Sequence, residues 1–248
     1  MSGVYPDQLK FATVSPIYKS KSHSNPSNYP ISVLPTVNKI IEQCIHNRFI
    51  TFLNKHEFLF ERQYGFHLKC GTINANFELL NEIYGELGKR KIVSGIFLDL
   101  AKAFDCVNHD LLLWKLELAG IRGPALKLIG SYLANRQQSV KVNGVSSSWK
   151  STAIGLPQGS TLGPLFFLIF INDMHKLKLK GHFNLFADDS ALFYQDQCLK
   201  NNVKSIEEDL TCIAEYFRLN RLTLNISKCN LIHFRSKKAD SAGYERHL

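Results

Sequence analysis

Three aspartates interrupt segments of the sequence that are otherwise built mostly from apolar residues. Asp188 and Asp189 lie inside "HFNLFADDSALFYQ", which runs from His182 to Gln195, and Asp99 ends the apolar run "GIFLD". Because side chains alternate between the two faces of a strand, only one of two neighbouring aspartates can easily point at a given spot. Two carboxylates about 4 Å apart repel by roughly 4 kcal/mol at an effective dielectric constant near 20. A chain that gathers such acids needs a cation or a proton to compensate them.

Clustered carboxylates of this kind suit a hard divalent cation. Magnesium takes oxygen ligands and is held by one or two carboxylates together with the phosphates of a substrate. Two such ions a few ångströms apart support in-line displacement at phosphorus. The ordinary interpretation is that aspartates occupy turns and helix starts, where they are favoured. We apply that interpretation to Asp105 and Asp110, and the metal-binding interpretation to Asp99, Asp188 and Asp189.

The spacing of apolar residues predicts the elements that position these acids. The short apolar run "IVSGIFLDL" is typical of a buried strand that carries Asp99 near its end. Two further strands, joined at the aspartate pair, form a predicted hairpin. Helices are expected at Thr36–Asn54, Gly71–Lys89, Asp110–Ala119, from about Ser160, and at Val203–Leu219, and strands at Ile92–Leu100, His182–Ala187, Ser190–Tyr194 and Asn230–Phe234.

Other local signals complete the expected fold. Asn143-Gly144 lies between alternating residues in "QSVKVNGVSSSW" and predicts a second hairpin. Residues 1 to 36 are rich in Ser, Pro, Asn and Lys, and we expect a loop or short strands there. Helices combined with antiparallel strands predict an α+β fold, with helices packed on one face of a sheet.

Composition and charge narrow the class of protein. The 248 residues are 45% apolar and 21% charged, as in an ordinary globular protein, and the formal net charge is +9. Basic surfaces supply most non-specific affinity for nucleic acids, so the charge weakly favours a polyanionic partner. Between Leu118 and Asn172 there is no acidic residue but there are five basic ones: Arg122, Lys127, Arg136, Lys141 and Lys150.

Cysteine spacing and hydropathy exclude other classes. The six cysteines include no C-x-x-C pair, which argues against a zinc knuckle or a disulfide framework and indicates a reducing, intracellular compartment, nuclear or cytoplasmic. No signal peptide is visible. The longest apolar run, Leu165–Ile171, is too short to span a bilayer, so we expect no membrane partner.

The "FADD" hairpin resembles the catalytic box of reverse transcriptases, and five further boxes follow the order of that family. "FLDLAKAFDCVNHDLLLWKL" resembles the first aspartate motif, "GLPQGSTLGPLFFLIFINDM" the template and nucleotide motif, and "LNRLTLNISKCNLIHF" the downstream lysine motif. "NYPISVLPTVNKIIEQCI" and "RQYGFHLKCGT" resemble the fingers motifs. The combination, over about residues 14 to 235, is similar to non-LTR retrotransposons of the jockey and LINE-like type.

The resemblance implies roles for the acidic cluster. Asp99 and Asp188 would bridge two Mg²⁺ ions, for which Mn²⁺ could substitute, and the carbonyl of Leu100 would help to hold one of them. Asp189 would be the more distant third carboxylate. Lys228 matches the lysine near the leaving pyrophosphate, where a positioned ammonium could act as general acid.

It also implies substrate-binding residues. Phe104 matches the position that blocks a ribose 2′-hydroxyl, although a plain core aromatic is the ordinary interpretation. Gln158 and Gly159 match positions that meet the incoming nucleotide and the template base. Lys19 or Lys21 would reach the triphosphate from the fingers.

The implied protein is an RNA-directed DNA polymerase that uses an RNA template, a DNA primer and dNTPs. The implied fold is a right-hand polymerase palm, an antiparallel ferredoxin-like sheet with helices on one face, plus fingers. We expect the fingers and N-terminal segment at 1–90, the palm with interleaved fingers elements at 91–235, and a disordered tail at 236–248. We expect neither a thumb nor an endonuclease region in this chain.

The sequence departs from the family at the fingers, which leaves alternatives open. "NYPIS" lacks the arginine that would clamp a triphosphate bidentately. His67 stands where arginine is common. One alternative is a catalytically impaired retrotransposon remnant that binds nucleic acid without polymerising. Others are a template-independent or RNA-making polymerase on the same palm, and an unrelated ferredoxin-like domain with chance motifs.

Overall fold

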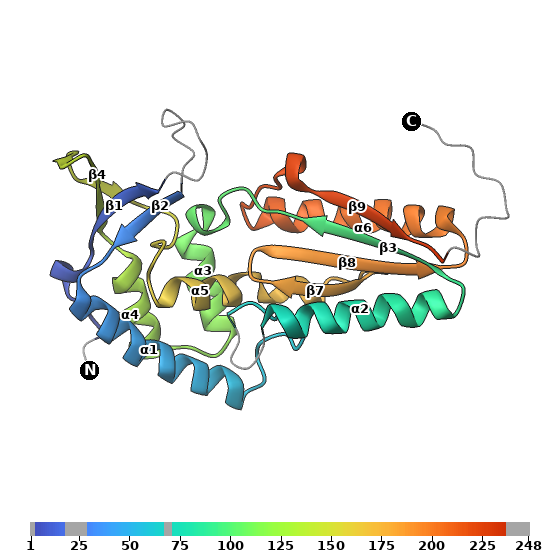
Figure 1. The fold of residues 1–248 in the computed structure, drawn as a ribbon. Helices are drawn as coiled ribbons and strands as arrows, with labels where there is room; N and C mark the ends of the chain where they lie inside the picture. The colour runs from blue at the N-terminus through green and yellow to red at the C-terminus, as the bar shows by residue number, and fades with distance from the viewer. Residues whose placement is uncertain (1–2, 18–28, 67–70, 237–248) are drawn as a thin grey trace. The chain divides into compact units, whose positions relative to one another are not determined.

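The chain folds as two compact units, each built from two separate stretches of sequence (Figure 1). The computed structural model describes residues 3–17, 29–66 and 71–236. Unit 1 combines Met1–Phe60 with Lys102–Asp173, and unit 2 combines Glu61–Ala101 with Met174–Leu248. The expected boundaries after residues 90 and 235 concern polymerase subdomains, and they stay predictions.

The sheet of unit 1 joins strands that lie far apart in the sequence. Its strands are β1 (Phe11–Ile17), β2 (Tyr29–Val33), β4 (Arg136–Val142), β5 (Val145–Ser146) and β6 (Lys150–Thr152). β1 pairs in antiparallel orientation with β2 and in parallel orientation with β4. The predicted Asn143-Gly144 hairpin is confirmed between β4 and β5. Both loop residues have positive φ, 49° and 83°, as a type I′ turn requires.

The helices of unit 1 include one that the apolar spacing did not predict. The described helices are α1 (Thr36–Lys55), α3 (His109–Leu118), α4 (Gly123–Leu133) and α5 (Leu162–Ile171), with short 3-10 turns η1 (Asp7–Leu9) and η2 (Ala103–Cys106). α1, α3 and α5 confirm the prediction. α4 was missed, although Pro124 in its first turn is a helix-start signal. α5 is buried nearly all round, so it shows no polar face, and its Pro164 lies in the first turn as expected.

Unit 2 contains the expected antiparallel sheet. Its strands run in the order β7 (His182–Phe186), β8 (Asp189–Asp196), β3 (Ile92–Leu98) and β9 (Asn230–Phe234), and every neighbouring pair is antiparallel. β3 lies inside the sheet and is buried along most of its length. The near-continuous apolar run that predicted a buried strand is therefore explained by this central position.

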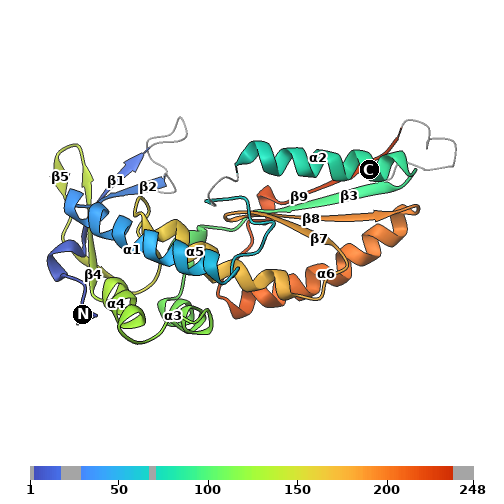
Figure 2. The same cartoon turned by 90° about the horizontal axis from the view of Figure 1, so that it is seen from below.

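Helices lie on both faces of this sheet. The described helices of unit 2 are α2 (Thr72–Gly88) and α6 (Leu199–Leu219), with a short η4 turn (Ile226–Lys228), and η3 (Asn172–Lys176) leads into the unit. Figure 2 shows α2 and α6 on opposite sides of the strands. The sequence predicted helices on one face of a sheet without specifying which helices, and the structure has a helix on each face. One of these helices is α2, which the sequence assigned to the N-terminal segment.

Successive side chains of β3 point to opposite faces of the sheet, so this one strand contacts a helix on each face. Val93 packs with Ile83 of α2 and Phe193 of β8 in a core cluster on one face. The next residue, Ser94, points to the other face and accepts a hydrogen bond of 3.0 Å from Asn202 of α6. No helix within the described ranges is long and apolar enough to cross a membrane.

Replacing Phe193 by alanine should strongly destabilise unit 2. The ring is 1% exposed and packs edge-on against Phe97 at 5.8 Å, above the space that Gly95 leaves. Losing a buried phenylalanine costs about 3–5 kcal/mol, because a cavity remains where the ring was. Urea denaturation followed by circular dichroism measures the change.

The matched control is Phe77→Ala on the outer face of α2. Phe77 is 66% exposed, so its replacement should change the free energy of unfolding by no more than about 0.5 kcal/mol. Equal losses for the two variants would contradict the packing of α2 on the sheet.

Candidate active site

The register of two neighbouring strands brings two of the aspartates together. β3 and β8 are antiparallel, and their last paired residues at this end are Leu98 and Ser190. The next residues in each direction are Asp99 and Asp189, so the register sets them opposite each other. Facing residues of an antiparallel pair have Cβ atoms about 4.5–5.5 Å apart. Two carboxylates from distant parts of the sequence thus lie side by side at the same end of the two strands.

The third aspartate lies in the turn between β7 and β8. Phe186 pairs with Asp189, which leaves Ala187 and Asp188 as the loop residues of a tight hairpin. The predicted hairpin with the aspartates at its tip is therefore confirmed. Ala187 has a φ of +57°, a left-handed conformation that normally favours glycine. This non-glycine residue is held in place by its surroundings.

Burial and mutual repulsion perturb these carboxyl groups. Burial raises the pKa of Asp188 most, and the charge of Asp99 raises it further, while its own backbone N–H and Lys228 lower it. Burial also raises the pKa of Asp189, and the charges of Asp188 and Asp99 add to the effect. Lys228 opposes the shift without cancelling it. The cluster holds more negative charge than the neighbouring side chains compensate.

Lys228 reaches the acids because the chain after α6 pairs with the chain after β3. The N–H of Ala101 donates to the carbonyl of Thr223 and the N–H of Asn225 donates to the carbonyl of Asp99, both at 2.8 Å. η4 follows directly, and Lys228 Nζ lies 3.4 Å from Asp99 Oδ2. The side chain of Asp99 is 23% exposed and that of Lys228 is 56% exposed. The two predicted site residues are therefore neighbours.

A cavity of about 380 Å³ opens beside this cluster. Asp99, Asp189 and Lys228 line one part of it, and Thr72, Asn76 and other residues of α2 line another. Phe97, Ala191 and Phe193 give it an apolar floor. Asp188 does not line this cavity. The prediction that Asp189 is the more distant metal ligand stays a prediction.

The donor set of the cluster fits a divalent cation. Asp99 Oδ2 is buried and has no hydrogen-bond partner among the described residues, so the long ion pair with Lys228 is its nearest compensation. No group of three or more His, Cys, Asp or Glu side chains in the described part of the chain is arranged so that it could hold a metal ion by itself. A magnesium site does not need such a group where one or two carboxylates are joined by the phosphates of a substrate. Leu100 is buried, and its predicted carbonyl contact stays a prediction.

The predicted substrate-binding residues Phe104, Gln158 and Gly159 belong to unit 1. Phe104 is half-buried and stacks on Phe167 at 4.8 Å, so it is at least partly a core aromatic. Gln158 Nε2 donates a hydrogen bond of 2.8 Å to Asp105 Oδ1. The backbone carbonyl of Gln158 accepts a hydrogen bond of 2.8 Å from the backbone N–H of Ser32. Sequence interpretation missed Asp105 as the partner of Gln158 and treated it as a turn residue.

Glycines allow the Gln158 loop to press against η2. Gly155 has a φ of +85°, and a Cβ there would lie 2.8 Å from the carbonyl oxygen of Asp105. The carbonyl oxygen of Gly155 lies 2.7 Å from Nε2 of His109. Gly159 has a φ of +99°, which turns the chain toward α5. Lys19 and Lys21 lie outside the described residues.

A buried acid at the start of α5 was also missed. Glu42 is 0% exposed, and its carboxylate accepts hydrogen bonds from the N–H of Thr161 at 2.6 Å, from Asn38 Nδ2 at 2.6 Å and from Tyr132 OH at 2.9 Å. Burial and the charge of Glu42 raise the pKa of Tyr132. A carboxylate near a helix N-terminus is favoured by the free N–H groups and the helix dipole. Glu42 thus holds the helix that follows Gln158.

The amino-acid sequence matches known proteins along most of its length. Residues 19–245 match the family described as "Reverse transcriptase (RNA-dependent DNA polymerase)". The chain is 30% identical over 240 residues to the probable RNA-directed DNA polymerase from transposon X-element of Drosophila melanogaster, covering 94% of this chain and 26% of that protein. It is 29% identical over 251 residues to the RNA-directed DNA polymerase from mobile element jockey of the same organism, covering 97% and 27%. The chain therefore spans about a quarter of the length of these curated relatives.

Solved structures with a similar fold include telomerases. A Candida tropicalis telomerase truncated from its C-terminal domain superposes with a TM-score of 0.68 at 14% identity, covering 98% of this chain and 52% of that chain. A Candida albicans telomerase, solved in complex with a TWJ fragment of telomeric RNA, gives 0.66 at 13% identity, covering 92% and 43%. At this identity the likeness concerns the fold, and it confirms the predicted fold class.

Removing one of the clustered charges should stabilise the protein in the absence of divalent cations. The pKa of Asp188 is raised in the folded state, so the contribution of this group to stability is present below pH 3.8 and is lost as pH rises through the folded pKa. At neutral pH the ionised Asp188 destabilises the folded state, and Asp188→Asn removes this charge. The variant should therefore melt at a higher temperature than the unaltered chain in EDTA. Added Mg²⁺ should raise the melting temperature more in the unaltered chain than in the variant.

Asp196→Asn on the same strand is the matched control with the opposite sign. The backbone N–H of Cys198 and the side chain of Asn201 lower the pKa of Asp196, so this group contributes stability above pH 3.8 that falls away as pH drops. The control should not melt higher in EDTA. A lower melting temperature for Asp188→Asn than for the unaltered chain would contradict the electrostatics of the cluster.

Proposed function

Because this chain belongs to the reverse transcriptase (RNA-dependent DNA polymerase) family, we propose that it carries the catalytic core of an RNA-directed DNA polymerase from a non-LTR retrotransposon. The reaction is the transfer of a nucleotide from a dNTP to the 3′-hydroxyl of a DNA primer on an RNA template. The observation that supports it best is the convergence of Asp99, Asp189 and Lys228 on one cavity beside the Asp188 turn.

Reverse transcriptases use divalent metal ions, and we assign Mg²⁺, with Mn²⁺ as a substitute, to the acidic cluster. Asp99 and Asp188 would hold the ions, with Asp189 and the carbonyl of Leu100 in supporting positions. When bound, such ions would lower the pKa of the primer 3′-hydroxyl and neutralise negative charge on the triphosphate. Oδ2 of Asp99 is buried and has no hydrogen-bond partner among the described residues, and this, with the raised pKa of Asp188 and Asp189, supports the assignment.

Lys228 has two tasks in this proposal. Its ammonium partly compensates Asp99 before substrate binds, at a distance of 3.4 Å. With substrate bound, it donates a proton to the oxygen of the leaving pyrophosphate as general acid. Its exposed position at the cavity is what permits contact with a phosphate.

The residues of unit 1 are assigned to the nucleotide and the template. Phe104 would exclude the 2′-hydroxyl of a ribonucleotide, and Gln158 and Gly159 would contact the nucleotide and the template base. Asp105 orients the amide of Gln158. Lys19 and Lys21 remain candidates for the triphosphate.

Phosphate contacts would come from the basic stretch of unit 1. Arg136 is excluded from this surface, because it is 3% exposed and donates to the carbonyl of Tyr132 at 3.3 Å. The remaining basic residues of the stretch are exposed: Arg122, Lys127, Lys141 and Lys150. Affinity that rests on such contacts falls as salt rises.

The proposal predicts primer extension that depends on Asp188. With an RNA homopolymer template, a complementary DNA primer and Mg²⁺ or Mn²⁺, Asp188→Ala should reduce incorporation by at least ~10³-fold, since a metal-binding carboxylate acts in the transition state. Asp196→Ala is the control, because Asp196 lies at the far end of β8, and it should incorporate normally.

The same assay decides between the enzyme and a remnant. Because "NYPIS" lacks the arginine that would clamp the triphosphate, we expect weak dNTP binding. The assay should therefore cover a wide range of dNTP concentrations. Nucleic-acid binding without incorporation at any dNTP or metal concentration would support a binding remnant and refute the polymerase proposal for this chain.

The role of Phe104 can be tested through sugar selectivity. Phe104→Ala should raise kcat/KM for ribonucleotides relative to deoxyribonucleotides by roughly 10- to 100-fold, because a steric barrier to one hydroxyl is removed. Phe77→Ala serves as the control with unchanged selectivity. If the unaltered chain already uses both sugars equally, Phe104 is not a gate, and its stacking on Phe167 is its whole role.

A further inference from the structure

The segment that precedes α2 runs alongside the hairpin that carries the aspartates. The N–H of Tyr64 donates to the carbonyl of Leu185 at 2.8 Å, and the N–H of Leu185 donates to the carbonyl of Arg62 at 2.9 Å. Gln63 and Leu185 form a parallel bridge. These residues act as a short extra strand beside β7. The segment therefore contacts the backbone of the hairpin directly.

The side chain of Gln63 continues this contact to the tip of the hairpin. Gln63 is 2% exposed, and its Oε1 accepts the N–H of Ala187 and the N–H of Gly65, both at 3.0 Å. One amide oxygen thus ties the residue before Asp188 to the neighbouring segment. Both N–H groups are buried, so either would be costly to leave unpaired.

Gly65 allows the two backbones to approach. A Cβ at position 65 would lie 2.3 Å from the backbone nitrogen of Ala187 and 2.9 Å from the carbonyl carbon of Phe186. Backbone atoms at such distances cannot move aside as a flexible side chain can. Position 65 must be glycine for the contact between Gln63 and Ala187 to form.

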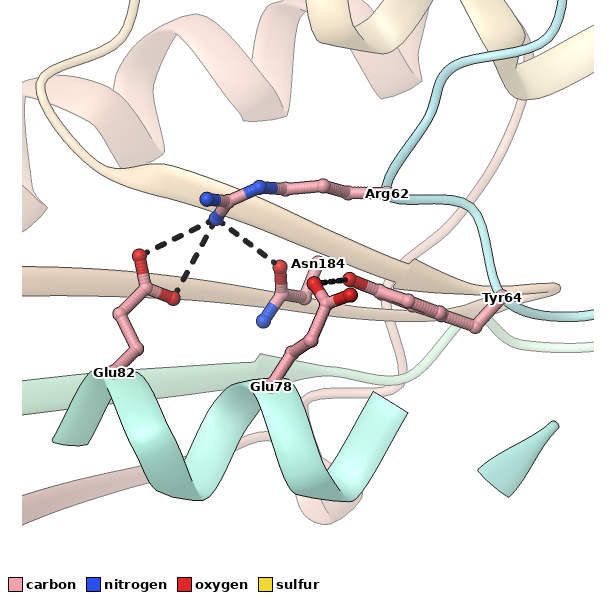
Figure 3. Close-up of polar contacts among 5 residues, drawn as sticks. All are labelled: Arg62, Tyr64, Glu78, Glu82 and Asn184. Atoms are coloured by element: carbon pink, nitrogen blue, oxygen red, sulfur yellow. Dashed lines mark hydrogen bonds and ion pairs between the residues drawn. The ribbon is translucent and has the colours of Figure 1, made fainter. Parts of the chain in front are cut away.

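The far side of the segment is anchored on α2 (Figure 3). Arg62 Nη1 forms an ion pair of 3.3 Å with Glu82 and also reaches Asn184 of β7. Tyr64 OH donates to Glu78. Figure 3 shows these residues converging from the segment, from α2 and from β7. Gln63 is thus held between a helix and the hairpin.

From this geometry we propose that Gln63 is a positioning residue for the acidic turn. Its amide oxygen fixes the left-handed Ala187, whose φ is +57°, and so determines where the adjacent Asp188 carboxylate lies. Gln63 does not contact substrate and acts through Ala187. The consequence for reaction rate rests on the proposed polymerase function, whereas the consequence for backbone order and cation binding does not.

Glutamine suits this position because it offers an uncharged acceptor. Asp99, Asp188 and Asp189 already place excess negative charge nearby, so a neutral amide adds an acceptor without adding charge. A residue of equal length without an oxygen would leave two buried N–H groups unpaired. Residues that support a metal ligand in this way typically change metal affinity or activity by 10- to 100-fold when replaced.

The test compares two replacements of nearly equal size. Gln63→Met removes the acceptor, and Gln63→Glu keeps an acceptor oxygen. Gln43→Met is the matched control, because Gln43 is exposed on α1. Each full-length variant is examined by amide hydrogen exchange in ¹⁵N-labelled protein, by Mn²⁺ titration followed by electron paramagnetic resonance, and by primer extension.

Gln63→Met should act locally. We expect the amide of Ala187 to exchange at least ~10-fold faster while the amides of β3 keep their rates. Mn²⁺ affinity should fall by about 10-fold, and kcat by about 10- to 100-fold with the KM for dNTP nearly unchanged. Gln63→Glu should retain the slow exchange of Ala187 and at least the original Mn²⁺ affinity. Gln43→Met should match the unaltered chain.

Three outcomes separate this inference from the proposed function. Unchanged exchange at Ala187 and unchanged Mn²⁺ affinity in Gln63→Met would overturn it. Uniformly faster exchange over β3, β7 and β8 would also overturn it, because it would show a merely structural role. If the unaltered chain incorporates no nucleotide, the polymerase proposal fails by itself, and the exchange and Mn²⁺ results still decide the role of Gln63.

Discussion

Asp99, Asp188 and Asp189 repel one another at the ends of neighbouring strands, and burial strengthens the repulsion because it removes screening water. Burial first, and the neighbouring acidic charges in addition, raise the pKa of Asp188 and Asp189, and Lys228 offsets this shift only in part. A protein gains no stability from such an arrangement. The surrounding structure must therefore hold the acids together by other contacts, and this requirement explains much of unit 2.

Those contacts come from apolar packing and from backbone hydrogen bonds rather than from charge. β3 is buried between α2 and α6 and cannot shift its register without exposing Val93 or burying polar groups. The chain after β3 is joined to the chain after α6 through Asp99 and Asn225. Gln63 and Gly65 close the remaining side of the turn. Packed neighbours thus keep the carboxylates in place although their charges repel.

Unit 1 also contains a buried acidic side chain, Glu42, whose charge must be compensated by its neighbours. Glu42 lies fully buried at the N-terminus of α5, where free N–H groups, Asn38 and Tyr132 supply its hydrogen bonds. α1 therefore turns a polar pair into the core and leaves Val37 and Ile40 more than half exposed. The loop with Gln158 is fixed on the other side by Asp105 and Ser32. The loop with Gln158 is positioned by polar contacts rather than by a simple apolar face.

The sequence alone determined most of the elements, though not α4, and it marked the acidic residues as candidates for a site, because periodicity and turn propensity are local properties. The Asn143-Gly144 hairpin, the β3 run and the "FADD" tip could be predicted for that reason, and the order of the motifs indicated the family. The tertiary structure alone decided which distant residues meet. The approach of Lys228 to Asp99, the burial of Glu42, the parallel pairing of β1 with β4 and the contact of Gln63 with Ala187 each depend on chain segments that pack from afar. No local pattern encodes such contacts, because the free energy that selects them comes from the whole packed unit.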